Sequence, residues 1–156
     1  MNTYEEKLKT YLKEHFIDAE YLTFTESCHS VAEAATAVRG KAEDFVKNIV
    51  LLDFENNLII AILKGEDRAD LKKIEALLSK KIRIATGEEV LVKTGYPPGG
   101  VPSLGYDALF LIDEKVMEKE FVYSGGGSDH SLLKISPIEI QRINQGRIIQ
   151  IRKVNV

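Results

Sequence analysis

Two continuous apolar runs dominate the pattern of hydrophobic and polar positions along the chain. Residues 47–52 are apolar after their first two positions, and residues 58–63 are apolar throughout. The segment between them, Asp-Phe-Glu-Asn-Asn, contains the residues typical of a turn. Because neither run alternates between polar and apolar positions, both strands are expected to be buried on both faces. The sequence therefore predicts a buried β-hairpin.

Apolar residues at helical spacing and capping sequences predict helices elsewhere. The capping-box pattern, Ser or Thr followed three positions later by Glu, occurs at Thr3, Ser30 and Thr86. Ser136 followed by proline predicts the start of a last helix. The predicted helices cover residues 3–14, 32–38, 68–78, 88–93 and 137–143, with one helical turn at 113–117.

Shorter apolar segments predict the remaining strands, at residues 20–24, 80–84, 107–112, 120–123, 131–135 and 147–151. The order of strands and helices is mixed and has a hairpin at its centre. We therefore predict a single α+β domain over residues 1–156, built on one mixed, strongly curved, barrel-like sheet with surrounding helices.

One segment between predicted elements can be neither a regular helix nor a central strand. Residues 96–105 read Tyr-Pro-Pro-Gly-Gly-Val-Pro-Ser-Leu-Gly. Proline fixes φ and lacks a backbone donor, while glycine allows positive φ and close approach of another molecule. The loop is either a rigid turn or a binding wall. A second glycine run at residues 124–128 raises the same two alternatives.

Composition and charge narrow the class of protein. Hydrophobic residues make up 44% of the 156 and charged residues 29%, and the net charge is −3, which argues against unspecific adhesion to polyphosphates. A single cysteine excludes an intramolecular disulfide. No apolar run approaches the roughly 20 residues of a membrane span. We expect a cytoplasmic protein with neither membrane nor DNA as a partner. Basic residues gather at 64–83 and 142–153, as contacts for a nucleic acid or as solvated faces.

The residue types limit the chemistry. The three histidines fall in unrelated segments, so the sequence predicts no metal site. Cys28 beside His29 is interpreted as a packing residue, because neighbours in sequence need not face each other. The glycine run at 124–128 lacks the Gly-Lys-Ser/Thr ending of a phosphate-binding loop. Lys47, which opens a buried strand, either turns its ammonium to water or holds it in a cleft, where burial lowers its pKa.

Five motifs, in order and spacing, resemble the YbaK/prolyl-tRNA synthetase editing-domain family. The resemblance covers about residues 25–142. The motifs are His29-Ser-Val-Ala-Glu-Ala-Ala35, Val46-Lys-Asn-Ile-Val-Leu51, Gly65-Glu-Asp-Arg68 with Asp70-Leu-Lys-Lys73, Thr94-Gly-Tyr-Pro-Pro-Gly-Gly-Val-Pro102, and Ser124-Gly-Gly-Gly127 with Leu132-Leu-Lys-Ile135.

The resemblance implies an enzyme that hydrolyses the ester of mischarged aminoacyl-tRNA in trans, without cofactor, metal or covalent intermediate. It implies that Lys47 positions and stabilises the substrate and that Gly99 and Gly100 line the scissile ester, with the terminal ribose hydroxyl helping to place the water. The other implied substrate-binding residues are His29, Ser30, Thr94, Gly95, Tyr96, Pro102, Ser124, Gly125, Gly126 and Gly127.

The implied substrate is a mischarged tRNA carrying a small amino acid such as Ala, Ser, Thr or Pro, with an aminoacyl-tRNA synthetase as a second partner to consider. Walls built by Val31, Ile49 and Val101 would discriminate by a methylene or two, worth about 1–3 kcal/mol. Arg68, Lys72, Lys73, Lys80 and Lys81 are the candidate tRNA contacts. The alternatives are a non-catalytic module that binds a nucleotide or RNA end in the same cleft, and a regulatory interaction protein.

Overall fold

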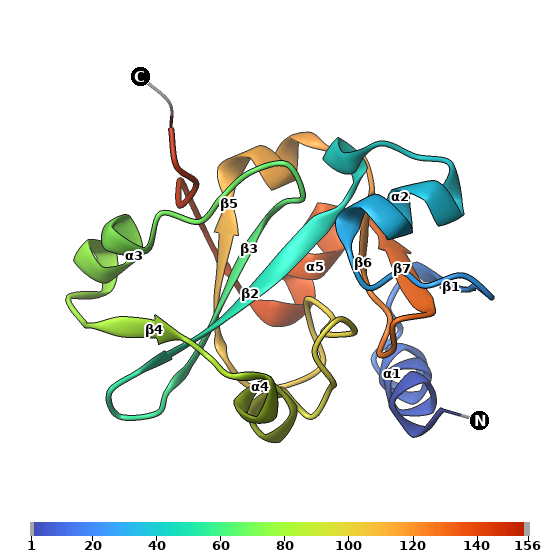
Figure 1. The fold of residues 1–156 in the computed structure, drawn as a ribbon, viewed down its shortest axis with the longest axis horizontal. Helices are drawn as coiled ribbons and strands as arrows, with labels where there is room; N and C mark the ends of the chain where they lie inside the picture. The colour runs from blue at the N-terminus through green and yellow to red at the C-terminus, as the bar shows by residue number, and fades with distance from the viewer. Residues whose placement is uncertain (1, 155–156) are drawn as a thin grey trace.

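The predicted hairpin forms the centre of the computed structural model, which describes residues 2–154 (Figure 1). Strand β2 (Val46–Asp53) pairs antiparallel with β3 (Leu58–Lys64), with Lys47 opposite Leu63. Nearly every residue of β3 is buried, and so is β2 from Val50 to Asp53, but residues 47–49 of β2 are only half-buried. The expectation of strands buried on both faces is therefore confirmed for β3 and only in part for β2. The turn is fixed by the buried Asp53 carboxylate, which accepts hydrogen bonds from the backbone N–H groups of Glu55 and Asn57.

The strands of residues 2–154 form two sheets, and neither is closed or strongly curled. One has five strands in the order β4-β2-β3-β5-β8, and the other has three in the order β1-β7-β6. The α+β class is correct, but the single barrel-like sheet is wrong. The other strands are β1 (Ala19–Thr23), β4 (Ile82–Ile84), β5 (Leu109–Asp113), β6 (Val122–Gly125), β7 (Ser131–Ile135) and β8 (Arg147–Ile149).

A single backbone bridge joins the two sheets in the described part of the chain, between Phe45 and Tyr123. Their rings also pack together, with centroids 4.9 Å apart. In Figure 1 the three-stranded sheet lies beside the N-terminal half of β2. The sheets therefore meet at one corner of β2 instead of continuing into each other, and this leaves the edge of β2 beyond Phe45 open.

Helices cover the sheets where sequence patterns predict them. They are α1 (Thr3–Glu14), α2 (Val31–Val38), α3 (Leu71–Leu78), α4 (Gly87–Thr94) and α5 (Pro137–Asn144), with 3-10 turns η1 (Ala42–Asp44) and η2 (Glu114–Glu118). Thr86 and Glu89 form the predicted capping box, and Ser136 caps α5. The predicted box at Thr3 is wrong, because the side chain of Asn2 caps α1 instead.

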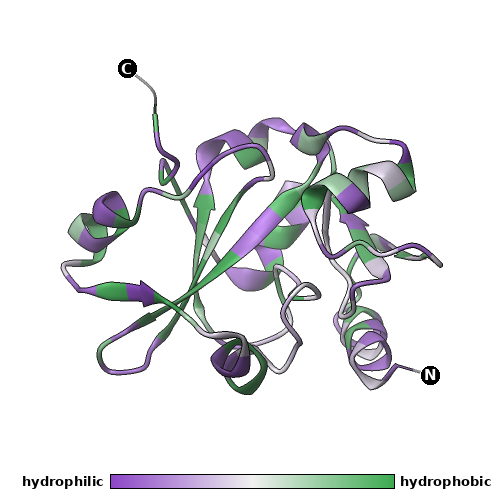
Figure 2. Cartoon of the chain, viewed as in Figure 1, coloured by the Kyte–Doolittle hydropathy of each residue, from purple (hydrophilic) through white to green (hydrophobic). Residues whose placement is uncertain are grey.

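The β2–β3 hairpin separates two apolar clusters. One contains Val46, Val50 and Tyr96 with residues of α1, α4, α5 and the three-stranded sheet. The other contains Leu51 and Ile74 with buried residues of β3, β5 and the segment after β8. Figure 2 shows β2 as mainly hydrophobic, with one hydrophilic segment in its N-terminal half. Between residues 2 and 154 no helix is both long and apolar enough to cross a bilayer.

Candidate functional site

A pocket of about 360 Å³ lies along the open edge of β2. Residues of α2 and the preceding turn form one side, and β4, α4 and the loop after α4 form the other. Its lining is mostly apolar, with polar groups from His29, Ser30, Lys47, Asn48 and Ser124. The pocket thus lies between the two sheets, where β2 has no strand neighbour. Val31, Ile49 and Val101, the predicted walls, also line it.

The two glycine-rich loops pack against each other directly behind the pocket. The N–H of Gly127 donates to the carbonyl of Gly100 over 2.8 Å. A Cβ added at Gly100 would lie 2.5 Å from the backbone nitrogen of Ser128, and one added at Gly125 would collide with the carbonyl of Val101. Side chains at these positions would push the loops apart, so glycine is required by the contact itself. The loop at 96–105 contributes Pro98, Gly99 and Val101 to the pocket lining, while the second glycine run is the turn between β6 and β7 and lines the pocket only through Ser124 and Gly125. We call the two packed loops the wall of the pocket.

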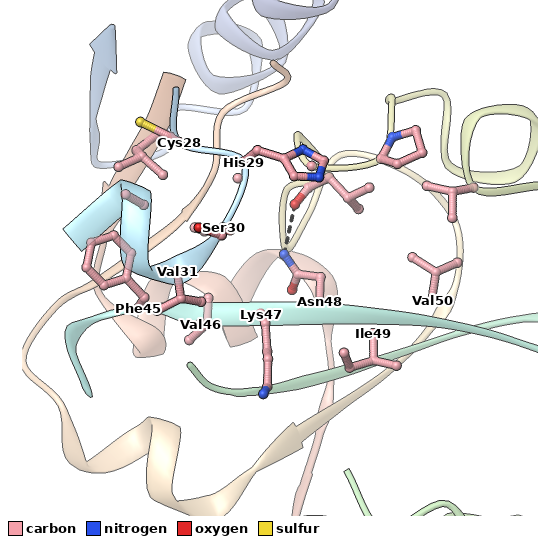
Figure 3. A pocket seen from close by; sticks show the side chains of 18 of the residues that line it. Cys28, His29, Ser30, Val31, Phe45, Val46, Lys47, Asn48, Ile49 and Val50 are labelled. Atoms are coloured by element: carbon pink, nitrogen blue, oxygen red, sulfur yellow. Dashed lines mark hydrogen bonds between the residues drawn. The ribbon is translucent and has the colours of Figure 1, made fainter. Parts of the chain in front are cut away.

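A chain of hydrogen bonds fixes this wall to β2. The amide nitrogen Nδ2 of Asn48 donates to the carbonyl of Val101 over 2.9 Å, drawn in Figure 3, and Asn48 Oδ1 accepts from Ser103 Oγ at 2.8 Å. Ser103 Oγ also lies 2.8 Å from Ser124 Oγ, and the carbonyl of Ser103 accepts from Asn144 Nδ2. Sequence reasoning assigned no role to Asn48 or Ser103. A polar residue inside a buried strand, which must find a hydrogen-bond partner, was the available signal.

His29 and Ser30 bring α2 to the pocket. Ser30 is the N-cap of α2 and accepts from the N–H of Glu33, so its hydroxyl has a structural task. The His29 ring lies against Gly99, where an added Cβ would overlap the ring. Gly99 has φ of +85°, a conformation that glycine adopts without strain. The ring of His29 and the backbone of Gly99 therefore meet at the pocket.

Lys47 lines the pocket, but its side chain leaves β2 on the face opposite to the Asn48 amide and away from His29 (Figure 3). The residue is half-buried. Burial lowers the pKa of its ammonium, while the Asp67 carboxylate raises it and the Arg68 guanidinium lowers it. The ammonium is thus on the side of the β3–α3 loop, and it does not point at the glycine wall.

Several predicted substrate contacts do not line this pocket. Thr94 ends α4 and bonds the backbone of Val90 and Tyr96, and Gly95 is the helix C-cap. Tyr96 is fully buried against α1, and burial raises its pKa to about 12. Thr94 and Tyr96 are thus buried in the fold, while Gly95 is half-buried and its carbonyl accepts a hydrogen bond from the Lys7 ammonium. The backbones of Gly100, Pro102, Gly126 and Gly127 lie behind the wall and support it.

The basic residues are divided between internal contacts and solvent. Lys73 donates to Gln150 Oε1, and Lys80 pairs with Asp53, so both have partners within the fold. Arg68, Lys72 and Lys81 are exposed and have no ion pair among the described residues. In the C-terminal cluster, Arg142 pairs with Glu139 and Arg152 pairs with Asp113 and Glu114. Between residues 2 and 154 no three acidic, His or Cys side chains gather as metal ligands would.

The fold and pocket define an α+β domain with a small, mainly apolar cleft walled by two glycine loops. The model of the aminoacyl-tRNA editing domain matches residues 25–143. The chain belongs to this family, so the resemblance seen in its motifs is confirmed.

Relatives of known sequence include both free-standing and larger proteins. The uncharacterised protein YwhH of Bacillus subtilis (strain 168) is 24% identical over 127 residues, which is 80% of this chain and 81% of YwhH. The proline–tRNA ligase of Shouchella clausii is 30% identical over 103 residues, which is 65% of this chain but 18% of the ligase. The chain therefore matches only a minor part of the ligase.

Solved structures share the whole fold. The hypothetical protein APE2540 superposes with a TM-score of 0.88 at 26% identity, covering 94% of this chain and 99% of that one. A candidate trans-editing enzyme for prolyl tRNA synthetase gives a TM-score of 0.90 at 24% identity and covers 99% of both chains. At this identity the second likeness concerns the fold alone. The α1 helix, which precedes the family match, is thus part of a fold that other chains share.

Proposed function

We propose that this chain hydrolyses, in trans, the ester bond of mischarged aminoacyl-tRNA carrying a small amino acid such as Ala, Ser, Thr or Pro. The observation that carries the proposal is that the family match, residues 25–143, contains every segment that lines the pocket. The pocket's apolar walls and modest volume suit a small side chain, and discrimination by size is worth only about 1–3 kcal/mol per methylene or two.

The wall of the pocket supplies rigidity for ester chemistry. Hydrolysis of an ester needs donors placed where the oxyanion develops and a positioned water. Gly99 brings bare backbone to the pocket, and the Asn48–Ser103–Ser124 hydrogen bonds hold that backbone still. The N–H of Gly100 donates to the carbonyl of Pro97 within the loop. Gly100 therefore acts in this proposal by shaping the wall, and Gly99 is the residue that meets the substrate.

Lys47 is assigned to the tRNA side of the substrate. An ammonium can hold either a phosphate or an ester oxygen, and the direction of the side chain, away from the glycine wall, favours the phosphate. Arg68, which is exposed near Lys47, would add a second cation on the same side. In this arrangement the acyl group enters the pocket while the terminal phosphate stays at its rim.

A panel of mischarged tRNAs, incubated with the protein and with Lys47→Ala, tests the function. We expect loss of the ester from tRNAs carrying small amino acids and a decrease of about 10- to 100-fold for Lys47→Ala, because the variant lacks one charge-assisted hydrogen bond to the substrate. Lys13→Ala removes an exposed lysine of α1 outside the family match and should keep full activity.

Near-normal turnover by a folded Lys47→Ala variant would remove the lysine from the mechanism. Tight binding of charged tRNA without ester loss from any member of the panel would instead identify a non-catalytic binding module. An unfolding curve for each variant separates these outcomes from misfolding, because a half-exposed lysine should affect stability by no more than about 0.5 kcal/mol.

A further inference from the structure

The open edge of β2 has backbone groups that no other strand uses. On one side β2 pairs with β3 along its whole length. On the other side it pairs with β4 only from Leu51 to Asp53, and its N-terminal end is bridged to β6 through Phe45 and Tyr123. The segment between these two contacts lines the pocket.

Two hydrogen bonds show which residues direct their backbone groups outward. The carbonyl of Phe45 accepts from the N–H of Gly65, so it points toward the β3 side. The carbonyl of Val50 accepts from the N–H of Ala85, so it points toward the β4 side. In an antiparallel pair the N–H and C=O of one residue point to the same side, and successive residues alternate. Asn48 therefore directs both its N–H and its C=O into the open edge.

The gap holds one residue. Asn48 is the outward-facing position between Val46, which adjoins the bridge to β6, and Val50, whose carbonyl is bonded to the N–H of Ala85. A hydrogen-bonded antiparallel pair consists of one residue facing one residue, exchanging an N–H and a C=O in each direction. An aminoacyl group carries the same atoms, an α-amine and a carbonyl on either side of one Cα. The gap thus matches a single amino acid and is too short for a strand.

We propose that the backbone of Asn48 binds the amino-acid part of the substrate as one residue of a β-ladder. The α-amine of the aminoacyl group donates to the carbonyl of Asn48, and the N–H of Asn48 donates to the ester carbonyl. The second contact falls on the oxygen that gains charge during hydrolysis, so it stabilises the transition state. The inference rests on the proposed function and adds that the substrate class requires a free α-amine.

The mode also agrees with the side chains of β2. Those of Val46 and Val50 belong to the apolar cluster on one side of the hairpin, and that of Asn48 is engaged with Val101 and Ser103. The Asn48 side chain therefore serves the wall while its backbone serves the substrate. Because main-chain atoms recognise the amine and the carbonyl, selectivity for the side chain of the amino acid comes from the pocket walls alone.

The first test compares tRNA esters of alanine and of propionate, which differ by the α-amine alone, with the lactate ester as one that keeps a donor. Each rate is divided by the spontaneous rate of the same ester, because the amine also affects intrinsic reactivity. We expect the enhancement to fall about 10- to 100-fold from alanyl to propionyl, with lactyl between them. Equal enhancement for alanyl and propionyl esters would overturn the inference while leaving the proposed function intact.

The second test does not require hydrolysis. Amide hydrogen exchange is followed by NMR with saturating 3′-alanylamino-3′-deoxyadenosine, a stable amide analogue, and with its propionyl counterpart. The N–H of Asn48 should exchange at least about tenfold more slowly with the alanyl analogue, because it becomes hydrogen-bonded. The N–H of Lys47, which faces β3, is the internal control and should not change. Unchanged exchange at Asn48 with bound alanyl analogue would refute the mode, whatever the activity.

Discussion

At the residue scale, glycine is required at Gly99 for two reasons, its backbone conformation and its contact with His29. Its φ of +85° lies in the left-handed region, and a Cβ there would overlap the ring of His29. Gly87, at the first position of α4, meets neither condition: the nearest atom to its Cβ position would be Pro98 Cγ at 3.5 Å, an ordinary contact. The two glycines therefore form a matched pair for substitution.

We expect Gly99→Ala to lower the free energy of unfolding by about 1–3 kcal/mol, the usual cost of a non-glycine residue in a strained conformation, and to reduce deacylation because His29 and the wall must move apart. Gly87→Ala should leave stability unchanged or raise it by up to about 1 kcal/mol. Urea unfolding of both variants, alongside deacylation assays, makes the comparison. Equal behaviour of the two would show that the Gly99–His29 contact is unimportant.

The same scale shows what local sequence can reveal about a site. Motif spacing indicated Lys47, His29 and Gly99, which stand in short, distinctive segments, and all three line the pocket. It misplaced Tyr96, since a tyrosine beside two prolines looks like a surface residue unless the packing of α1 is known. It also passed over Asn48, whose partners at Val101 and Ser103 lie more than fifty residues along the chain.

At the element scale, the β2–β3 turn depends on one carboxylate. The Asp53 side chain accepts from two backbone N–H groups, from Asn57 Nδ2 and from the Lys80 ammonium. These bonds, with the backbone N–H of Asn57 first, lower the pKa of Asp53 from 3.8 to about 2. The charged form is therefore favoured in the folded protein.

A folded-state pKa below the unfolded value adds stability above the unfolded pKa and loses it as pH falls through the folded pKa. We expect stability to fall between about pH 5 and pH 2, and Asp53→Asn to reduce the dependence in that window. Urea midpoints at pH 7 and pH 3 for both proteins measure the effect. If the variant loses as much stability as the parent between these values, the Asp53 bonds are not responsible. Glu89 and Glu139, with pKa values of about 2, and Asp44, whose pKa is lowered by its hydrogen bond from Lys119, add to the loss of stability in acid.

Helices and strands could be predicted from the sequence where a short segment carries the signal. The pairing of strands far apart in the sequence could not. The hairpin followed from two apolar runs joined by a turn, and α4 followed from its capping box. The pairing of β1 with β7 joins residues more than one hundred positions apart, and nothing in either short segment specifies its partner. The sequence therefore predicts one curved sheet where the structure has two.

At the scale of the whole molecule, several exposed basic side chains have no acidic partner among the described residues and are available to bind a polyanion. The net charge is −3, and two of the four basic residues at 142–153, Arg142 and Arg152, have acidic partners. Arg68, Lys72 and Lys81 do not, and they belong to the region around α3 and β4. This supports tRNA contacts there through a small number of phosphates.

Binding of charged tRNA should weaken with ionic strength. Replacing Arg68, Lys72 and Lys81 together with alanine should reduce affinity and lower the salt slope by about one for each phosphate that is no longer neutralised. Arg142→Ala, which removes a guanidinium already paired with Glu139, is the matched control and should bind like the parent. Dissociation constants at two salt concentrations give the slope. Affinity independent of salt would exclude binding through phosphates.

The short length of the open β2 edge also affects behaviour in concentrated solution. Unpaired strand edges recruit strands from other molecules and begin aggregates, and proteins commonly cover them. Here the bridge at Phe45 and the bond from Ala85 to Val50 leave one outward residue between them. An incoming strand finds too few partners to form a ladder. The chain can therefore keep backbone groups available to a ligand and still resist self-association through that edge.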